Sequence, residues 1–187
     1  MTNEATQIDR LSRRTVVKAG AVTLGALGLF TPAVAARPLP PESQTVDAPS
    51  GFGVELLNGH ATFPDTVTAK FRMQYEGGNG SLVSNLMYDA SSVVVAKVTW
   101  APEGTSGWHT HPGPVIVSVA EGELVVVNER DCIPRTYTAG QAFIDPGQGN
   151  VHIASNPSPT EGAVAYATFL GVPVGAPATV WVPPVDC

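Results

Sequence analysis

Charged side chains, and basic ones above all, are scarce in this sequence. Only 14% of the 187 residues are charged, and 10 Lys and Arg stand against 16 Asp and Glu. No stretch gathers enough positive charge to bind a phosphate backbone or an anionic lipid surface against this negative balance. We therefore expect no nucleic-acid partner.

Long apolar segments and helical periodicity are scarce as well. The apolar run Ala19–Phe30 has about a dozen residues, whereas a membrane-spanning helix needs about 20. Only residues 81–88 offer a short segment that could turn helically. Instead, 19 Gly and 17 Pro divide the chain into short runs, which is typical of an all-β protein.

Residues 1–35 have the features of an export signal. Arg13 and Arg14 precede the apolar run, and the small residues Ala33 to Ala35 follow it. This order predicts a twin-arginine signal, read by the twin-arginine export machinery, and a periplasmic or extracellular location. Cleavage and retention as an anchor both stay open. Cleavage would leave 6 basic and 14 acidic side chains, a net charge of −8.

The sequence has two cysteines, Cys132 and Cys187, and both lie in the exported part. An oxidising compartment would let them pair, and only one pairing exists. The alternative, a thiol metal ligand, has no second ligand at short spacing to support it. We therefore predict a disulfide that attaches the last residue of the chain to the folded domain.

The polar, Pro-rich residues 36–50 predict a flexible leader, and residues 51–187 predict a single all-β domain. Short β-branched runs alternate with turn residues, as in an antiparallel sandwich or barrel. Glu121 and Gly122 separate two such runs and predict a tight hairpin. The predicted strands are Val54–Leu57, Thr66–Gln74, Ser92–Trp100, Val115–Ala120, Glu123–Asn128, Ala142–Ile144, His152–Ser155, Val164–Leu170 and Thr179–Val182.

Two histidines one residue apart follow Trp108 at the start of an apolar run. Alternate side chains of a strand project from the same face, about 6 to 7 Å apart, so His109 and His111 would point into the same space. Two imidazoles held in this way can bind one metal ion at about 2.0–2.1 Å. The pair alone also fits two polar residues at a strand entrance.

A second stretch, Gly140–Asn156, contributes a third histidine after a Pro and a Gly-rich turn. The two stretches together resemble the paired motifs of the cupin superfamily, in the form of a small bacterial single-domain cupin. The resemblance spans about residues 93–170 and implies a single cupin barrel, which is a double-stranded β-helix or jelly roll. The matching residues are Gly104, His109, His111 and Gly122 in the first motif and Gly140, Pro146, Gly149, His152 and Asn156 in the second.

The resemblance implies a divalent metal ion held by His109, His111 and His152. The fourth ligand of the family, a glutamate, falls at Val115, which cannot bind metal. Either three neutral imidazoles hold the ion and leave open positions, or the site no longer binds metal. The presence of all three histidines favours the first interpretation. Iron, manganese, zinc, copper and nickel all stay open as the ion.

Two classes of function are compatible with such a site. The first is a small-molecule metalloenzyme of the oxygenase type, such as a metal-dependent dioxygenase, because some three-histidine cupins are dioxygenases. The second is a non-catalytic exported protein that binds a metal or a small ligand, because the fold serves both. The partner is a small molecule in either case, and the resemblance makes a homodimer an expected state. An acid/base group beside the metal, inside a closed apolar pocket, would favour the enzyme.

Several other residues have two possible roles. We expect His60 to be a solvated loop histidine, with a fourth metal nitrogen as the alternative. The tryptophans are expected in the core, with cavity walls as the alternative. Asn156 is expected to order the turn after His152 or to support a ligand. The candidates for proton transfer that lie nearest in sequence, to none of which we assign a role, are Glu103, Tyr137 and Asp145.

Overall fold

The chain is all-β in the computed structural model, which describes residues 45–75, 81–83, 86–87 and 89–187. Within these ranges there is no helix long and apolar enough to cross a membrane. The strands are β1 (Ser50–Thr62), β2 (Arg72–Gln74), β3 (Ser81–Val83), β4 (Ser92–Thr105), β5 (His109–Thr110), β6 (Val115–Glu121), β7 (Glu123–Asn128), β8 (Arg135–Thr138), β9 (Ala142–Asp145), β10 (His152–Ser155), β11 (Ala163–Leu170) and β12 (Val180–Trp181).

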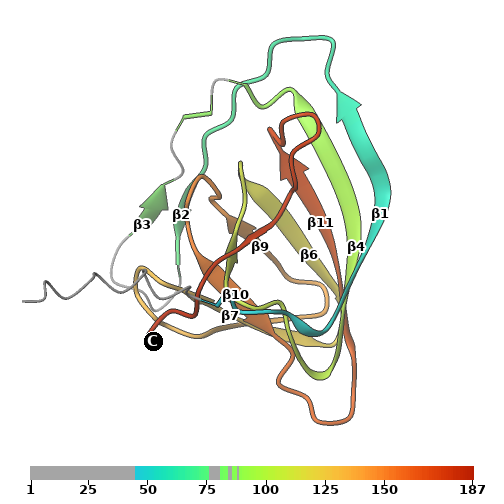
Figure 1. Cartoon of the computed structure of the whole chain (residues 1–187), viewed down its shortest axis with the longest axis vertical. Helices are drawn as coiled ribbons and strands as arrows, with labels where there is room; N and C mark the ends of the chain where they lie inside the picture. The colour runs from blue at the N-terminus through green and yellow to red at the C-terminus, as the bar shows by residue number, and fades with distance from the viewer. Residues whose placement is uncertain (1–44, 76–80, 84–85, 88) are drawn as a thin grey trace, which may run out of the picture. The chain divides into compact units, whose positions relative to one another are not determined.

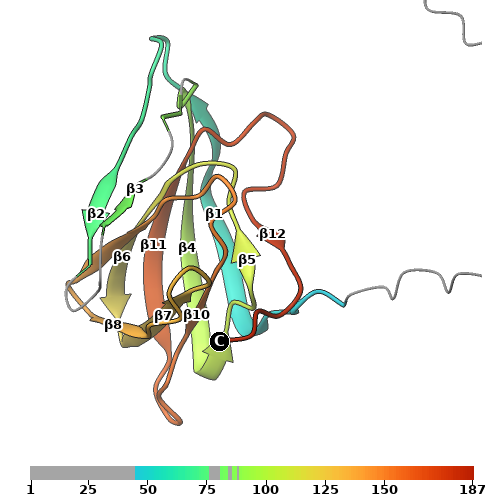
Figure 2. The same ribbon diagram turned by 90° about the vertical axis from the view of Figure 1, so that its left-hand side faces the viewer.

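The strands other than β2 and β3 form one antiparallel sheet that curls into a barrel with two walls. The first wall has the order β1-β4-β11-β6-β9, and these strands follow one another around the barrel in Figure 1. The second wall has the order β12-β5-β10-β7-β8, and Figure 2 shows β12 beside β5. The walls join where Ser155 pairs with Thr105. This architecture confirms the predicted single cupin-type barrel.

The core lies between the two walls and follows from the alternation of side chains along the strands. In residues 94–100 of β4, in residues 115–120 of β6 and throughout β11, every second residue is buried, and its neighbours are half-buried or exposed. Because successive side chains of a strand point to opposite faces, one face of each strand covers the interior. The buried residues are mostly small or β-branched and include Val94, Ala96, Val98, Trp100, Val115, Val117, Val119, Ala163, Ala165, Ala167 and Phe169.

The connection between β6 and β7 differs from the prediction. The predicted hairpin at Glu121 and Gly122 is wrong, because β6 pairs with β9 and β11, whereas β7 pairs with β8 and β10. Gly122 has a φ of 73°, and a Cβ there would lie 2.6 Å from the carbonyl oxygen of Gly162. A glycine at positive φ supports a sharp corner between sheets as well as a hairpin. Whether Gly122 forms a hairpin or a corner depends on the distant strands with which β6 and β7 pair.

The segment before β4 also differs from the prediction. Residues 81–88 are not helical where they are described, because Ser81–Val83 pairs with β2 and Met87 forms a bridge with Ala69. The predicted strand Thr66–Gln74 shrinks to β2. Strands β5 and β8, of two and four residues, were not among the predicted strands.

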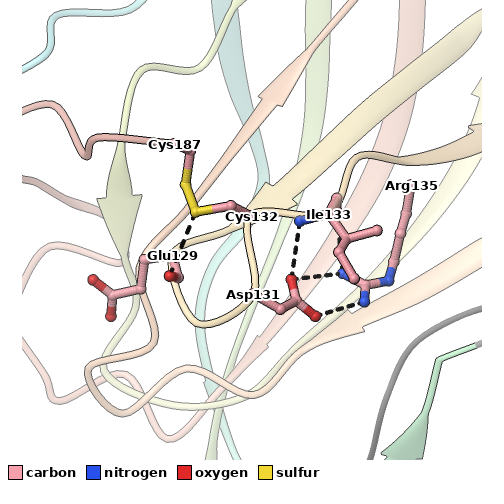
Figure 3. Close-up of a disulfide and its surroundings, with 6 residues drawn as sticks. All are labelled: Glu129, Asp131, Cys132, Ile133, Arg135 and Cys187. Atoms are coloured by element: carbon pink, nitrogen blue, oxygen red, sulfur yellow. Dashed lines mark hydrogen bonds and ion pairs between the residues drawn. A yellow bond between two sulfur atoms is a disulfide. The ribbon is translucent and has the colours of Figure 1, made fainter.

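Cys132 and Cys187 form the predicted disulfide, across a sequence separation of 55 residues. It joins the loop between β7 and β8 to the end of the chain, as Figure 3 shows. Nη2 of Arg135, the first residue of β8, lies 2.6 Å from Oδ2 of Asp131 in this loop. The C-terminal segment, which includes β12, is therefore attached at its far end.

The predicted signal, residues 1–35, and most of the predicted leader lie outside the described residues. At the described end of the leader, the backbone N–H of Asp47 donates to the carbonyl oxygen of Val182 at 2.9 Å. The side-chain Oδ2 of Asp47 accepts a hydrogen bond from the backbone N–H of Trp108 at 2.9 Å. The residues just before β1 are therefore attached to the barrel, next to the strand that carries His109.

Candidate metal centre

The three predicted histidines come together inside the barrel. His109 and His152 are directly opposed in the ladder between β5 and β10, so their side chains project from the same face. Their ring centroids are 4.3 Å apart, and the ring of His111 is 4.8 Å from that of His109 and 5.3 Å from that of His152. Two separate motifs of the sequence thus form one cluster.

The cluster has the properties of a metal-ligand set. Its nitrogen donors lie within 4.8 Å of one another, and the side chains are at most 6% exposed. Burial lowers the pKa of His109, lowers the pKa of His152 well below its ordinary value, and lowers the pKa of His111 to about 3. Neutral imidazoles keep the lone pair that a metal ion requires. The residues present therefore fit a divalent ion that prefers nitrogen ligands.

Backbone carbonyl groups fix the tautomers of two of these histidines. Nδ1 of His109 donates to the carbonyl oxygen of Gly107 at 2.8 Å, and Nδ1 of His111 donates to that of Ala178 at 2.8 Å. A carbonyl oxygen can only accept, so Nδ1 carries the hydrogen in both rings and Nε2 carries the lone pair. Hydrogen bonds of this kind orient the histidine ligands of metal sites.

A buried carboxylate stands beside the third histidine. Oδ1 of Asp145 lies 3.4 Å from Nδ1 of His152, although Nδ1 has no hydrogen-bond partner among the described residues. Oδ1 accepts a hydrogen bond from Nδ2 of Asn150 at 2.6 Å, and Oδ2 accepts one from the backbone N–H of Gly147 at 3.0 Å. Burial raises the pKa of Asp145. The carboxylate therefore faces Nδ1 of His152, which leaves Nε2 of this ring as the atom free to bind a metal.

The turn before β10 connects the two histidine motifs. The backbone N–H of Gln148 donates to the carbonyl oxygen of His111 at 2.8 Å. Gly147 has a φ of 60°, and a Cβ there would clash with the backbone of Gly113. A side chain at this position would therefore separate the two motifs, which explains why the turn requires glycine.

A small, mostly apolar cavity of about 80 Å³ opens on the three histidines. This volume is below the about 300–1,000 Å³ of pockets for drug-sized ligands. Its polar lining, among the described residues, consists of the three histidines, Ser106, Asp145 and Thr179, and it includes no Lys or Arg. The cavity can therefore hold a small molecule whose binding depends on contact with the ion and with apolar walls.

The mouth of this cavity lies beside β1. Val54 and Leu56 are opposite the buried Val98 and Ala96 in the ladder between β1 and β4, so they point to the inner face of the sheet. Both line the cavity, yet their side chains are 52% and 60% exposed. The inner face of the barrel is thus open to solvent along this edge strand.

Val115 lines the same cavity and is 1% exposed. It occupies the position where the cupin resemblance places a glutamate ligand. The described part of the chain therefore offers three imidazoles and no carboxylate ligand in this cluster.

The remaining residues singled out from the sequence lie around the site. His60 is on β1, outside the cluster, and its Nε2 donates to the carbonyl oxygen of Val172 at 3.1 Å. Trp100 lines the cavity, and its indole N–H donates to the carbonyl oxygen of Ala154. The amide of Asn156 binds backbone groups on both sides of the turn after β10, as one of the two readings predicted.

The sequence did not reveal the position of Asp145, which it offered only as the acid nearest along the chain. The register between β6 and β9 places this carboxylate in the cavity, opposite Val115. The alternation of Phe143 and Asp145 along a short strand is the one local signal that could have indicated an inward-facing acid.

Comparison with known proteins gives the same family resemblance. No family model matches the chain. A putative germin-like protein 12-4 of Oryza sativa subsp. japonica is 34% identical over 94 residues, which are 46% of this chain and 41% of the relative. Germin-like protein 8-5 of the same plant is 30% identical over 109 residues, which are 54% and 48% of the two chains.

The chain spans less than half the length of these curated relatives. Among solved structures, a cupin-like protein of Thermotoga maritima is 26% identical, with a TM-score of 0.43 over 50% of this chain and 67% of that one. The germin-like relatives share sequence with roughly half of the chain.

Proposed function

On the basis of a cupin-type barrel with germin-like relatives, we propose that this protein binds one divalent metal ion through Nε2 of His109, His111 and His152 and acts on a small molecule there. The observation that carries the proposal is the set of three buried, neutral imidazoles whose Nδ1 atoms face a carbonyl oxygen or a carboxylate. Such partners fix the tautomer and leave Nε2 for the metal.

The type of reaction follows from the charge of the site. Three imidazoles add no negative charge, so a bound ion keeps its double charge and acts as a strong Lewis acid with open positions. The walls of the cavity are mostly apolar, and Asp145 is an acid/base group that lies beside the proposed ligand His152. We propose an oxygenase-type reaction on a small oxygenated molecule. Because no cation lines the cavity among the described residues, the ion itself would attract an anionic oxygen of that molecule.

Nitric oxide, a stand-in for dioxygen, tests this proposal. The protein is loaded with ferrous iron without oxygen, exposed to nitric oxide and examined by electron paramagnetic resonance. The expected result is an iron–nitrosyl signal in the parent and none in the His109→Ala/His111→Ala variant. Iron that binds to the parent but does not react with nitric oxide would contradict the oxygenase reaction.

The alternative function is non-catalytic binding of a metal or small ligand. The observation in its favour is that the cavity has few groups able to transfer a proton, since Asp145 is the only carboxylate among its described lining residues. In the nitric oxide experiment, tight binding of iron without an iron–nitrosyl signal would show that the ion has no open coordination position and would favour this alternative.

We also propose that residues 1–35 direct export by the twin-arginine route to the periplasm or the extracellular space. The disulfide between Cys132 and Cys187 supports an oxidising compartment. Replacement of Arg13 and Arg14 by Lys should keep the protein inside the cell, and unchanged export would contradict the route. We also propose a homodimer that forms through the free edge of β1, which pairs only with β4 among the described strands. Sedimentation of the protein as a monomer would contradict it.

A further inference from the structure

A second depression lies on the side of the barrel where β8 and β9, the edge strands of the two walls, come next to β2. It has a volume of about 750 Å³. Unlike the mouth beside β1, its lining mixes polar and apolar side chains. The lining residues are Met73, Gln74, Tyr75, Ile133, Pro134, Arg135, Thr136, Tyr137, Gln141, Ala142, Phe143 and Ile144. We call this depression the β8–β9 groove.

We call the cavity that opens on the three histidines the metal cavity. A third space, of about 10 Å³, lies between the β8–β9 groove and the metal cavity. Tyr75, Tyr137 and Phe143 line both the groove and this small cavity. Phe143, Asp145 and His152 line both the small cavity and the metal cavity. Because each space shares walls with the next, the three form a series that runs from solvent to the histidines.

Aromatic rings form the barrier between the groove and the small cavity. The ring centroids of Tyr137 and Phe143 are 4.8 Å apart, at an interplanar angle of 32°. The guanidinium carbon of Arg135 lies 4.0 Å from the ring centroid of Tyr75, and the same guanidinium is paired with Asp131. The barrier is therefore one or two side chains thick. Arg135 packs against it from the side of the groove.

The small cavity has a polar lining on its inner side, where Asp145 and Asn128 accompany His152. Nδ1 of His152 is buried there without a hydrogen-bond partner. A space of about 10 Å³ is at the lower limit for one water molecule, and polar partners favour water over an empty cavity. The lining and the size both fit a molecule of two or three atoms and exclude a larger organic molecule.

We propose that the β8–β9 groove is a second entrance to the metal cavity, for molecules of the size of water or dioxygen, and that Tyr137 is its gate. Larger molecules enter by the mouth beside Val54 and Leu56. This inference concerns the cavity and does not depend on bound metal. Combined with the proposed function, it gives dioxygen a route that the organic substrate cannot use.

Quenching of tryptophan phosphorescence in the metal-free protein tests the second entrance. Trp100 lines the metal cavity and is 5% exposed, and it becomes the only indole when Trp108 and Trp181 are replaced by Phe. In this background Tyr137→Ala should raise the rate constant for quenching by dissolved dioxygen severalfold. The matched control is Tyr166→Ala, on the outer face of β11 with 44% exposure, which should leave that rate constant unchanged.

Acrylamide, which is too large for the small cavity, reports on the mouth instead. Leu56→Phe should slow quenching by acrylamide and leave the response of Tyr137→Ala to dioxygen intact. A dioxygen rate constant that Tyr137→Ala does not change would overturn the proposal. An equal rise for both quenchers would overturn it too, because it would mean general loosening of the barrel.

A second measurement covers the case in which the single-tryptophan background fails to fold. The protein with all its tryptophans is labelled with fluorotryptophan, and ¹⁹F relaxation by dissolved dioxygen is compared between the parent and Tyr137→Ala. The Trp100 signal should relax faster in the variant, whereas the Trp108 and Trp181 signals, which come from residues that do not line the cavity, should not. An unchanged Trp100 signal would overturn the entrance.

Discussion

Val115 and Asp145 are directly opposite each other in the antiparallel ladder between β6 and β9. Both are buried, and both line the metal cavity. Opposed side chains of such a ladder project from the same face, with Cβ atoms about 4.5–5.5 Å apart. The carboxylate of this site therefore comes from the neighbouring strand, and it contacts a histidine instead of taking the place of the missing glutamate.

Val115→Glu should make the protein depend on metal for stability. A carboxylate buried opposite Asp145 should lower the free energy of unfolding of the metal-free protein by on the order of 3 kcal/mol. Zinc should restore much of this loss, because the glutamate can become a fourth ligand. The measurement is urea unfolding with and without zinc. Val115→Gln is the uncharged control, and an equal response of both variants to zinc would contradict the prediction.

Asp145→Asn should weaken metal binding without removing a ligand. Loss of a carboxylate that supports a histidine ligand typically costs about 10–100-fold in metal affinity, and competition with a chelator measures that affinity. Asp131→Asn is the control, because it removes a carboxylate paired with Arg135 at the surface. If both variants bind metal as tightly as the parent, Asp145 has no such role.

The metal-free protein should lose stability as the pH falls. Burial depresses the pKa of all three histidines in the folded state, whereas the unfolded chain has the ordinary value of about 6.5. Below that value the unfolded state binds more protons, so the free energy of unfolding decreases from about pH 6.5 downward. For His111 the decrease continues toward its folded value of about 3.

Urea midpoints measured across this range of pH check the prediction. Replacement of the three histidines by Asn should flatten the dependence, which identifies its source. A parent midpoint that does not change between about pH 7 and about pH 5 would contradict burial of neutral imidazoles.

Removal of the disulfide should lower stability more than it affects the metal site. Closing a loop with a sequence separation of 55 residues stabilises a fold by about 4 kcal/mol in the chain-entropy model. Cys132→Ser/Cys187→Ser should lose approximately this amount in denaturant unfolding. The metal affinity should change little, because none of the histidines touches the disulfide and β12 stays paired with β5. A stability equal to that of the parent would show that the pairing does not form.

The sequence was sufficient to predict the barrel and the cluster of three histidines, because each is marked by a pattern of neighbouring residues. Alternating strands appear as short β-branched runs, and His109, His111 and His152 lie within recognisable motifs. The corner between the two walls at Gly122 and the place of Asp145 could not be predicted in the same way. Both depend on which distant strands pair and in what register, and a positive-φ glycine or a lone acid is compatible with several answers.

The most direct test of the three-histidine metal centre is elemental analysis of the protein, purified without added metal or chelator, beside His152→Ala and His60→Ala. His60 is the matched control, since it lies outside the cluster. We predict about one equivalent of a divalent metal in the parent and in His60→Ala, and none in His152→Ala. A parent that contains no metal and takes up none when ions are added would contradict the account.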